Sequence, residues 1–339
     1  MTQRTSQGTT MQILVTGATG FIGQTLCRRL LDAGHFIRAL VRDPSRLGLL
    51  EHRVAPFVGD VTQPETLEGV EENVDVVVHL AALGHVSAIS EEAFENFRRV
   101  NVEGTANLLR RFHGTQISKF IHVSSTAAMG LIKAPLVSED HPPQPATPYQ
   151  KSKHQSEIEA LSHWSDAEVP VCVIRPCMVY GIGGEGEFLK QTRLIKKGVF
   201  PRVGLGKNLT PLVHVADVVQ GIEKALTKGV PGSTYLICGE DSLDLAHMRR
   251  LILKALNVGP RPFVYVPGWA MRLAATGVEQ WAVRTGGTPI VTRRNIENTI
   301  YDRRFDISRA HRDLGYSPAV SPEMGIPETV KWFIQTGRV

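Results

Sequence analysis

Short apolar runs alternate with amphipathic stretches through the first half of the chain. The runs have the length and the Val, Ile and Leu content that are typical of buried strands. In the stretches between them, apolar residues recur at the spacing of a helix. This alternation predicts βαβ units and a parallel sheet. We expect strands at residues 12–16, 36–41, 54–58, 75–80, 119–123 and 171–175. We expect helices at residues 21–33, 64–70, 91–113 and 148–164.

The first predicted strand leads into a glycine-rich turn, Thr-Gly-Ala-Thr-Gly-Phe-Ile-Gly, and then into a helix. The first glycine allows a tight turn, the second lets backbone amides approach a pyrophosphate, and the third lets the helix lie close to the sheet. The N-terminus of the helix presents unpaired N–H groups to the phosphates. The turn therefore predicts a dinucleotide site. Its expected contacts are Gly17, Thr19, Gly20, Phe21, Ile22 and Gly23.

The composition changes after about residue 180, where a junction rich in glycine is followed by glycine- and proline-rich stretches between short helices. We expect an α/β fold with a doubly wound, Rossmann-type parallel sheet and a smaller C-terminal lobe. Residues 11–180 form the dinucleotide-binding domain in this interpretation, and residues 181–339 form mainly a substrate-binding lobe. Two further apolar runs look like strands, so residues 212–238 are expected to return in part to the first domain. Residues 1–10 are expected to be a disordered extension.

The residues after the second predicted strand bear on the type of nucleotide. A carboxylate directly after this strand would bind a free ribose 2′-hydroxyl, but the position holds Arg42, whose guanidinium can pair with a 2′-phosphate. Arg46 is close enough in sequence to assist. Asp43 favours NAD(H) unless it caps the turn, and both arginines are also compatible with an ordinary solvated surface. We predict NADP(H), with NAD(H) as the alternative.

The ends of the third and fourth predicted strands supply further candidate contacts. A carboxylate after the third strand can accept a hydrogen bond from the adenine amino group. Small residues after the fourth strand let the chain pass close to the middle of the cofactor. These candidates are Asp60, Val61, Leu80, Ala81 and Ala82.

Tyr149 and Lys153 stand four residues apart on a predicted helix and therefore share one face. An ammonium beside a phenol lowers the pKa of the phenol, which makes it a better acid–base catalyst near neutral pH. Ser124 and Ser125 follow the fifth predicted strand, where a hydroxyl can polarise a substrate carbonyl. A Tyr/Lys pair at this spacing is common on ordinary helices. Its combination with the glycine turn and the strand-end serines predicts a reaction centre.

The segments TGATGFIG, HLAA, VSST, YQKSK and RPCMVYG, in this order and spacing, resemble the extended short-chain dehydrogenase/reductase family, from Met11 to about Pro318. The resemblance implies that Tyr149 is the proton donor or acceptor and Lys153 its partner. It implies Ser125 as the carbonyl-orienting hydroxyl, because the family hydroxyl stands five residues before a glycine matched by Gly130. It also implies supporting or cofactor roles for Asn101, Pro176 and Met178.

Two branches of this family are possible. Nucleotide-sugar epimerases and dehydratases hold NAD tightly and commonly carry Lys near the position of Gly84 and Arg at that of Thr210, which bind a diphosphate. Both cations are missing here. The second branch resembles 3β-hydroxysteroid dehydrogenases and dihydroflavonol reductases, so we expect an NADP(H)-dependent ketoreductase or hydroxyl dehydrogenase for a hydrophobic sterol-, polyketide- or lipid-like substrate. The expected pocket wall is His85, Met129, Met178 and Tyr180. A nucleotide-sugar epimerase or dehydratase, and a non-catalytic NAD(P)-sensing regulator, are the alternatives.

The composition limits the classes of binding partner that we expect for this chain. The net charge is +5, and the basic residues are scattered without interleaved aromatic residues, so nucleic acid is not expected. The four cysteines lie in or beside apolar runs without a CxxC pair, which is typical of a reduced cytoplasmic protein. No cluster has metal-ligand spacing, so no metal is expected. By family resemblance, a homodimer through helices 91–113 and 148–164 is expected.

No apolar run approaches the length of about 18 residues that a membrane span needs. The stretch 267–286 carries apolar residues that we expect on one helical face. Either this helix is a lid packed on the smaller lobe, or it forms a mouth for a lipid-like substrate and touches a membrane. The residues are Trp269, Leu273, Ala274, Val278, Trp281 and Ala282.

Overall fold

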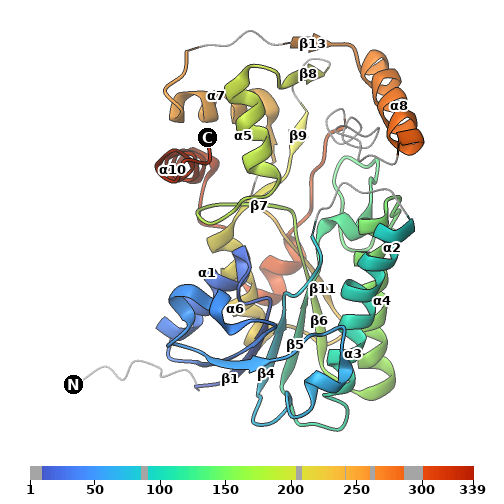
Figure 1. Ribbon diagram of the computed structural model, residues 1–339, viewed down its shortest axis with the longest axis vertical. Helices are drawn as coiled ribbons and strands as arrows, with labels where there is room; N and C mark the ends of the chain where they lie inside the picture. The colour runs from blue at the N-terminus through green and yellow to red at the C-terminus, as the bar shows by residue number, and fades with distance from the viewer. Residues whose placement is uncertain (1–9, 85–90, 204–207, 241, 260–263, 286–300) are drawn as a thin grey trace, which may run out of the picture.

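A seven-stranded parallel sheet forms the centre of the computed structural model (Figure 1), which describes residues 10–84, 91–203, 208–240, 242–259, 264–285 and 301–339. The strand order is β11-β6-β5-β4-β1-β2-β3, with β1 between β2 and β4. The direction of winding therefore reverses beside β1, and ligands of such sheets bind at this switch point. The strands are β1 Gln12–Thr16, β2 Phe36–Val41, β3 Ala55–Val58, β4 Val76–His79, β5 Lys119–Val123, β6 Val171–Pro176 and β11 Thr234–Ile237.

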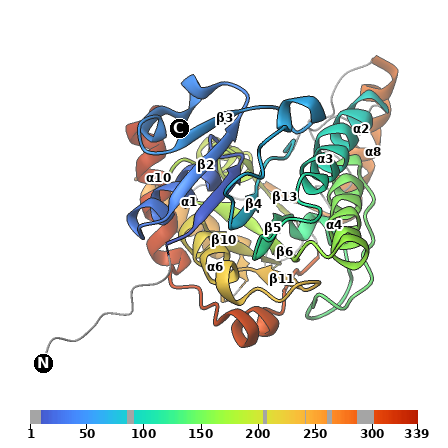
Figure 2. The same ribbon diagram turned by 90° about the horizontal axis from the view of Figure 1, so that it is seen from below.

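Side chains of successive strand residues point to opposite faces of this sheet, and both faces are covered by helices. Ile13 and Val15 of β1 lie in a core with α1 (Phe21–Asp32) and α6 (Val215–Lys228), whereas Leu14 lies in a second core with α3 (Gly104–Arg110). Figure 2 shows α1 and α6 on one side of the sheet, and α3 with α4 (Pro148–Ala167) on the other. The Rossmann-type α/β fold is confirmed, and the six expected strands are present within one or two residues of their expected ends.

The helix expected at 91–113 is not continuous. It comprises α2 Glu91–Phe97, a π-helical segment η3 Arg98–Glu103, and then α3. A π-helical turn inserts a residue into the α-helical ladder and is frequently found at functional sites. The helix expected at 64–70 is a single 3₁₀ turn, η2 Pro64–Leu67. The other short turns are η1 Pro44–Leu50, η4 Thr126–Met129 and the π-helical η5 Ala310–Leu314.

The second half of the chain builds a smaller lobe with its own core (top of Figure 1). Helices α5 Glu187–Lys197, α7 Leu245–Ala255 and α10 Pro322–Gln335 pack together there. Three strand pairs accompany them: β7 Met178–Tyr180 with β10 Leu212–His214, β9 Leu209–Thr210 with β12 Leu243–Asp244, and β8 Pro201–Val203 with β13 Val264–Val266. Helix α8 Gly268–Thr285 follows β13.

The chain crosses between the two lobes more than once. Of the two later runs expected as strands, one forms β11 at the edge of the main sheet, and the other forms β10 in a separate pair. The extension expected at 1–10 lies almost entirely outside the described residues. Within the described ranges, no helix combines the length and the apolar character that crossing a bilayer requires.

Candidate active site

The glycine turn between β1 and α1 is packed so tightly that side chains are excluded. Gly17 has φ +70°, and a Cβ there would lie 2.9 Å from the backbone nitrogen of Ala81. A Cβ on Gly23 would lie 2.1 Å from the carbonyl oxygen of Gly17, so the close approach of this helix is to the turn itself. Gly20 is exposed at the N-cap of α1, whose first turn contains no acidic residue. The turn therefore leaves exposed backbone and a positive helix end, which suit a pyrophosphate.

Polar side chains tie the carboxyl ends of β1 and β4 together. Thr16 and His79 are in register, with Thr16 Oγ1 2.8 Å from His79 Nδ1. The same threonine oxygen accepts a hydrogen bond from the Ala81 backbone N–H at 3.0 Å. His79 Nε2 lies 3.0 Å from Thr105 Oγ1. These bonds fix the loop after β4, where Leu80, Ala81 and Ala82 were expected to meet the cofactor.

Asn101 links this loop to the helix that carries Tyr149. Its Oδ1 accepts a hydrogen bond from the Leu83 N–H at 2.7 Å, and its Nδ2 donates to Ser152 Oγ at 3.0 Å. Ser152 Oγ in turn donates to the Tyr149 carbonyl at 2.9 Å. Asn101 is buried within the π-helical segment η3. This placement suits the supporting role that the family resemblance implies for it.

Tyr149 lies in the first turn of α4, which begins with a capping box formed by Thr147 and Gln150. Its half-buried ring packs against Phe97, with centroids 5.7 Å apart. Lys153, one turn later, is buried, and its Nζ donates to the Val123 carbonyl at 3.1 Å. Burial lowers the pKa of Lys153 to about 8, and the carboxylate of Glu157 opposes this shift.

The two serines after β5 have different environments. Ser125 is half-buried, and its Oγ accepts a hydrogen bond from the Ala127 N–H at 3.1 Å as the cap of η4. Ser124 is buried, and its Oγ finds no partner among the described residues. Gly130 ends the same segment with φ +73°, and a Cβ there would overlap the Gln144 carbonyl. Of the two serines, Ser125 has the more accessible hydroxyl.

The sequence analysis assigned no role to two histidines that the structure buries beside the candidate site. His79 and His122 are in register on β4 and β5, and their rings stack with centroids 5.5 Å apart. Burial lowers the pKa of His79 to about 3 and lowers that of His122 strongly, and the nearby Lys153 charge adds to both shifts. His122 Nε2 lies 3.0 Å from Ser156 Oγ, which donates to the Lys153 carbonyl. Both rings are therefore neutral, and His122 contacts α4 whereas His79 contacts α3. The sequence signal that could have identified them is a histidine near the end of each of these two apolar strands.

The candidates for adenosine recognition lie after β2 and β3. The Arg42 side chain is 72% exposed, and its Nη1 is 4.0 Å from an Asp60 oxygen. Asp43 caps η1 by accepting hydrogen bonds from the Ser45 N–H and hydroxyl, which lower the pKa of Asp43. Asp60 accepts similarly from Thr62. Arg46 is exposed on the same turn.

The structure describes three of the four residues that were expected to form the pocket wall. Met129 is 0% exposed and belongs to the hydrophobic core that also contains Val123 and Ile174. Tyr180 is buried between the rings of Phe188 and His214. Met178 is half-buried, and His85 lies outside the described residues.

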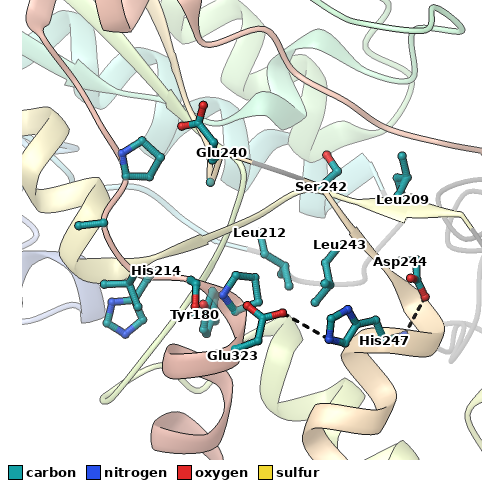
Figure 3. A pocket seen from close by; sticks show the side chains of 16 residues that line it. Tyr180, Leu209, Leu212, His214, Glu240, Ser242, Leu243, Asp244, His247 and Glu323 are labelled. Carbon is teal, nitrogen blue, oxygen red and sulfur yellow. Dashed lines mark hydrogen bonds and ion pairs between the residues drawn. The ribbon is translucent and has the colours of Figure 1, made fainter.

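Tyr180 also borders a cavity of about 450 Å³ in the smaller lobe (Figure 3). The cavity lies between β9, β10, β12, the start of α7 and residues 318–323. His247 Nε2 lies 3.3 Å from Glu323 Oε1 at this cavity. Ser125, Tyr149 and Lys153 do not line it. In the described part of the chain, no group of three or more His, Cys, Asp or Glu side chains is arranged to hold a metal ion.

Known proteins resemble the whole chain. A 3 beta-hydroxysteroid dehydrogenase/Delta 5→4-isomerase of Mycobacterium tuberculosis is 26% identical, over 95% of this chain and 90% of that protein. A UDP-glucose 4-epimerase of Vibrio cholerae is 30% identical, over 95% of both chains. The crystal structure of the dTDP-glucose 4,6-dehydratase DesIV of Streptomyces venezuelae, with NAD bound, has a TM-score of 0.76 and 26% identity and covers 96% of this chain and 97% of that chain. The model of the NAD dependent epimerase/dehydratase family matches residues 13–238. The protein therefore belongs to the NAD dependent epimerase/dehydratase family, as an enzyme of the extended short-chain dehydrogenase/reductase type.

Proposed function

We propose that the enzyme is an NADP(H)-dependent ketoreductase or hydroxyl dehydrogenase for a hydrophobic substrate. The observation that carries this proposal is the exposed guanidinium of Arg42 directly after β2, in a chain that also places Tyr149 and Lys153 one turn apart on α4. The glycine turn, Asp60, Val61, Leu80–Ala82, Asn101, Pro176 and Met178 are the proposed remaining cofactor contacts. Bound NADP(H) supplies the hydride donor or acceptor.

Side chains of the protein bind the substrate oxygen and transfer the proton to or from it. Ser125 donates a hydrogen bond from its hydroxyl to the substrate oxygen, while the Ala127 N–H donates to its Oγ and fixes the position of that oxygen. The Tyr149 phenol gives a proton to that oxygen in reduction and takes it in oxidation. The Lys153 ammonium favours the phenolate electrostatically. The hydrogen bond from Lys153 Nζ to the Val123 carbonyl holds this ammonium at the end of β5.

The groups after β2 support the proposed preference for NADP(H). Asp43 caps η1 through Oδ1, which accepts from the Ser45 N–H and hydroxyl and turns this carboxylate toward the start of η1. Arg42 remains exposed, with a distant contact to Asp60. A guanidinium recognises a phosphate by paired, charge-assisted hydrogen bonds. Arg42, with help from Arg46, therefore favours the 2′-phosphate of NADP(H).

Two uncharged positions support the proposed substrate class. Gly84 is exposed, with open space where a Cβ would stand, and Thr210 is buried on β9. Neither offers a cation for a diphosphate. The steroid dehydrogenase of M. tuberculosis, similar over 95% of the chain, supports an apolar substrate.

A nucleotide-sugar epimerase or dehydratase is the second candidate. The 30% identity to the UDP-glucose 4-epimerase of V. cholerae favours it. Both candidates would use Tyr149 and Lys153, so these residues do not discriminate between them. Tightly held NAD and affinity for UDP would support the second candidate.

One experiment separates the two. Thermal unfolding is recorded with NADPH, NADH and UDP, because a ligand stabilises the folded state according to its affinity. Oxidation of NADPH is then followed with 3-ketosteroids and other apolar ketones. We expect stabilisation by NADPH above that by NADH, none by UDP, and a turnover that falls by about 10²–10⁴-fold in Tyr149→Phe. Conversion of UDP-glucose with endogenous NAD would contradict the proposal.

We also propose a cytoplasmic homodimer formed through α2, α3 and α4. The exposed Ile158 on the outer face of α4 supports an interface there. Sedimentation of wild type and Ile158→Glu would test the dimer, since a buried charge would dissociate it.

The cysteines support the proposed compartment. All four are buried and unpaired, which suits a reducing environment.

A further inference from the structure

Helix α8 has an unusual distribution of side chains. Ala275 and Ala282, two turns apart, are each 2% exposed and face the protein. Trp269, Leu273 and Trp281 are 67%, 65% and 68% exposed. At 100° per residue, these three lie on the side opposite the two alanines. The expectation of one shared apolar face is therefore corrected, because Ala282 lies on the inner face and both tryptophans lie on the outer one.

This pattern is the reverse of that of an ordinary surface helix. A surface helix buries its large apolar residues and exposes polar ones. On α8, small alanines face inward and the largest apolar side chains face water. The helix stands at the edge of the smaller lobe, where its outer side is away from the rest of the protein (Figure 1).

The size of this face argues against an interface with a second copy. Two indoles and one Leu side chain at two-thirds exposure offer on the order of 400 Å² of apolar surface. A stable dimer buries about 800 Å² on each partner. A patch of this size on one molecule is instead typical of a smaller functional contact.

The chemistry of the face suits a lipid surface. Tryptophan is enriched where membranes meet water, because its ring is apolar and its N–H is polar. The sequence 268–285 contains two arginines and one glutamate, and Arg284 is exposed at the end of the helix. The net charge of the chain is +5, which favours anionic headgroups.

We propose that the outer face of α8, formed by Trp269, Leu273 and Trp281, binds the surface of an anionic phospholipid bilayer. The helix lies in the plane of the interface, its two indoles and Leu273 enter the headgroup–acyl boundary, and Arg284 pairs with phosphate. The attachment is reversible, because one short amphipathic helix buries far less apolar surface than a spanning segment.

The test measures co-sedimentation of the full chain with vesicles of phosphatidylcholine, alone or mixed with phosphatidylglycerol. We expect binding to the mixed vesicles that weakens with added salt and with loss of the anionic lipid. The triple variant Trp269→Ser/Leu273→Ser/Trp281→Ser should bind at least about tenfold more weakly than wild type, since it removes the inserted apolar groups. Leu49→Ser is the matched control, because Leu49 is 80% exposed but lies on η1, and it should bind like wild type.

Circular dichroism and the thermal midpoint show whether the triple variant is folded. Should it fail to fold, Trp281→Ser alone replaces it, with a smaller loss expected. Equal binding of the folded variant and wild type, or no binding of wild type to anionic vesicles, would overturn the proposal. A wild-type dimer that becomes monomeric in the variant, without vesicle binding, would instead assign the face to a second copy. None of these measurements depends on catalysis, so the result is independent of the proposed function.

Discussion

Glu157 holds the buried guanidinium of Arg175 by two hydrogen bonds, from Nε to Oε1 at 2.9 Å and from Nη2 to Oε2 at 2.7 Å. The pair joins α4 to β6 and also places a carboxylate one helical turn after Lys153. Burial lowers the pKa of Lys153, and this carboxylate limits the shift. A structural ion pair therefore helps to keep the lysine beside Tyr149 charged.

Glu157→Gln is expected to have two effects. The charge of Lys153 loses its support, so its pKa falls further below about 8, and the alkaline limb of the kcat/KM profile moves to lower pH. Arg175 is left buried without a counterion, which costs about 3–5 kcal/mol of stability. Urea unfolding and the pH profile measure the two effects separately.

Glu159→Gln is the matched control, because Glu159 lies on the same helix and pairs with His163. It should leave the alkaline limb unchanged. A Glu157→Gln profile identical to that of wild type would show that Glu157 does not act on the reaction through Lys153.

His79 makes stability depend on pH in a predictable direction. Its folded-state pKa, about 3, lies below the ordinary value of 6.5, so the unfolded chain binds a proton that the folded chain excludes. The stability from the neutral ring is complete above pH 6.5 and is lost as pH falls toward 3. The loss is up to about 1.4 kcal/mol for each pH unit.

Urea unfolding of wild type and His79→Asn between pH 7.5 and pH 5 should therefore show a shallower slope in the variant, by about one proton. Asparagine retains a group near the position of Nδ1, so the contact with Thr16 can persist. His52→Asn, at an exposed position, should follow the wild-type slope. Parallel curves for all three proteins would contradict a neutral His79.

Local patterns in the sequence were sufficient to predict the strands of the main sheet. Strands such as β5 are buried on both faces, so a short continuous apolar run marks them and leaves little freedom in their limits. The candidate cofactor turn was also predictable, because steric demands on Gly17 and Gly23 are local to the turn. Nothing comparable marked the π-helical segment that positions Asn101, since it follows from packing and hydrogen bonding across elements.

The surroundings of individual site residues were harder to predict, because they too depend on packing between elements. Met129 is fully buried, and its carbonyl accepts a hydrogen bond from the N–H of Gln144 on a separate segment. The neutral state of His79 and His122 depends on their being adjacent across two strands and close to Lys153. Residues on β4, β5 and α4 together create the environments of these histidines, and no single short window of the sequence contains all three elements.

Arg42→Ala tests the cofactor preference. If the guanidinium pairs with the 2′-phosphate, the variant loses charge-assisted hydrogen bonds, and the Kd for NADPH rises by about 10- to 100-fold. The Kd for NADH should change little, because NADH carries no phosphate there. Fluorescence titration of the bound nicotinamide measures both constants.

Arg53→Ala is the control for Arg42→Ala. Arg53 is also a surface arginine near η1, but it pairs with Asp32. This variant should keep the affinity for both cofactors. An equal loss for NADPH and NADH in Arg42→Ala would point to adenine stacking and not to phosphate recognition.

Gly23→Ala tests the turn as the dinucleotide cradle. The added methyl would stand 2.1 Å from the Gly17 carbonyl oxygen and 2.8 Å from the Ala18 Cα, so the backbone of the turn must move. We expect a cost of about 1–3 kcal/mol in stability and a loss of affinity for both NADPH and NADH. Gly186→Ala is the matched change, because a Cβ at that helix cap meets no atom within 4 Å. It should leave both properties near wild type. Cofactor binding that survives in a stably folded Gly23→Ala would show that the pyrophosphate is held elsewhere.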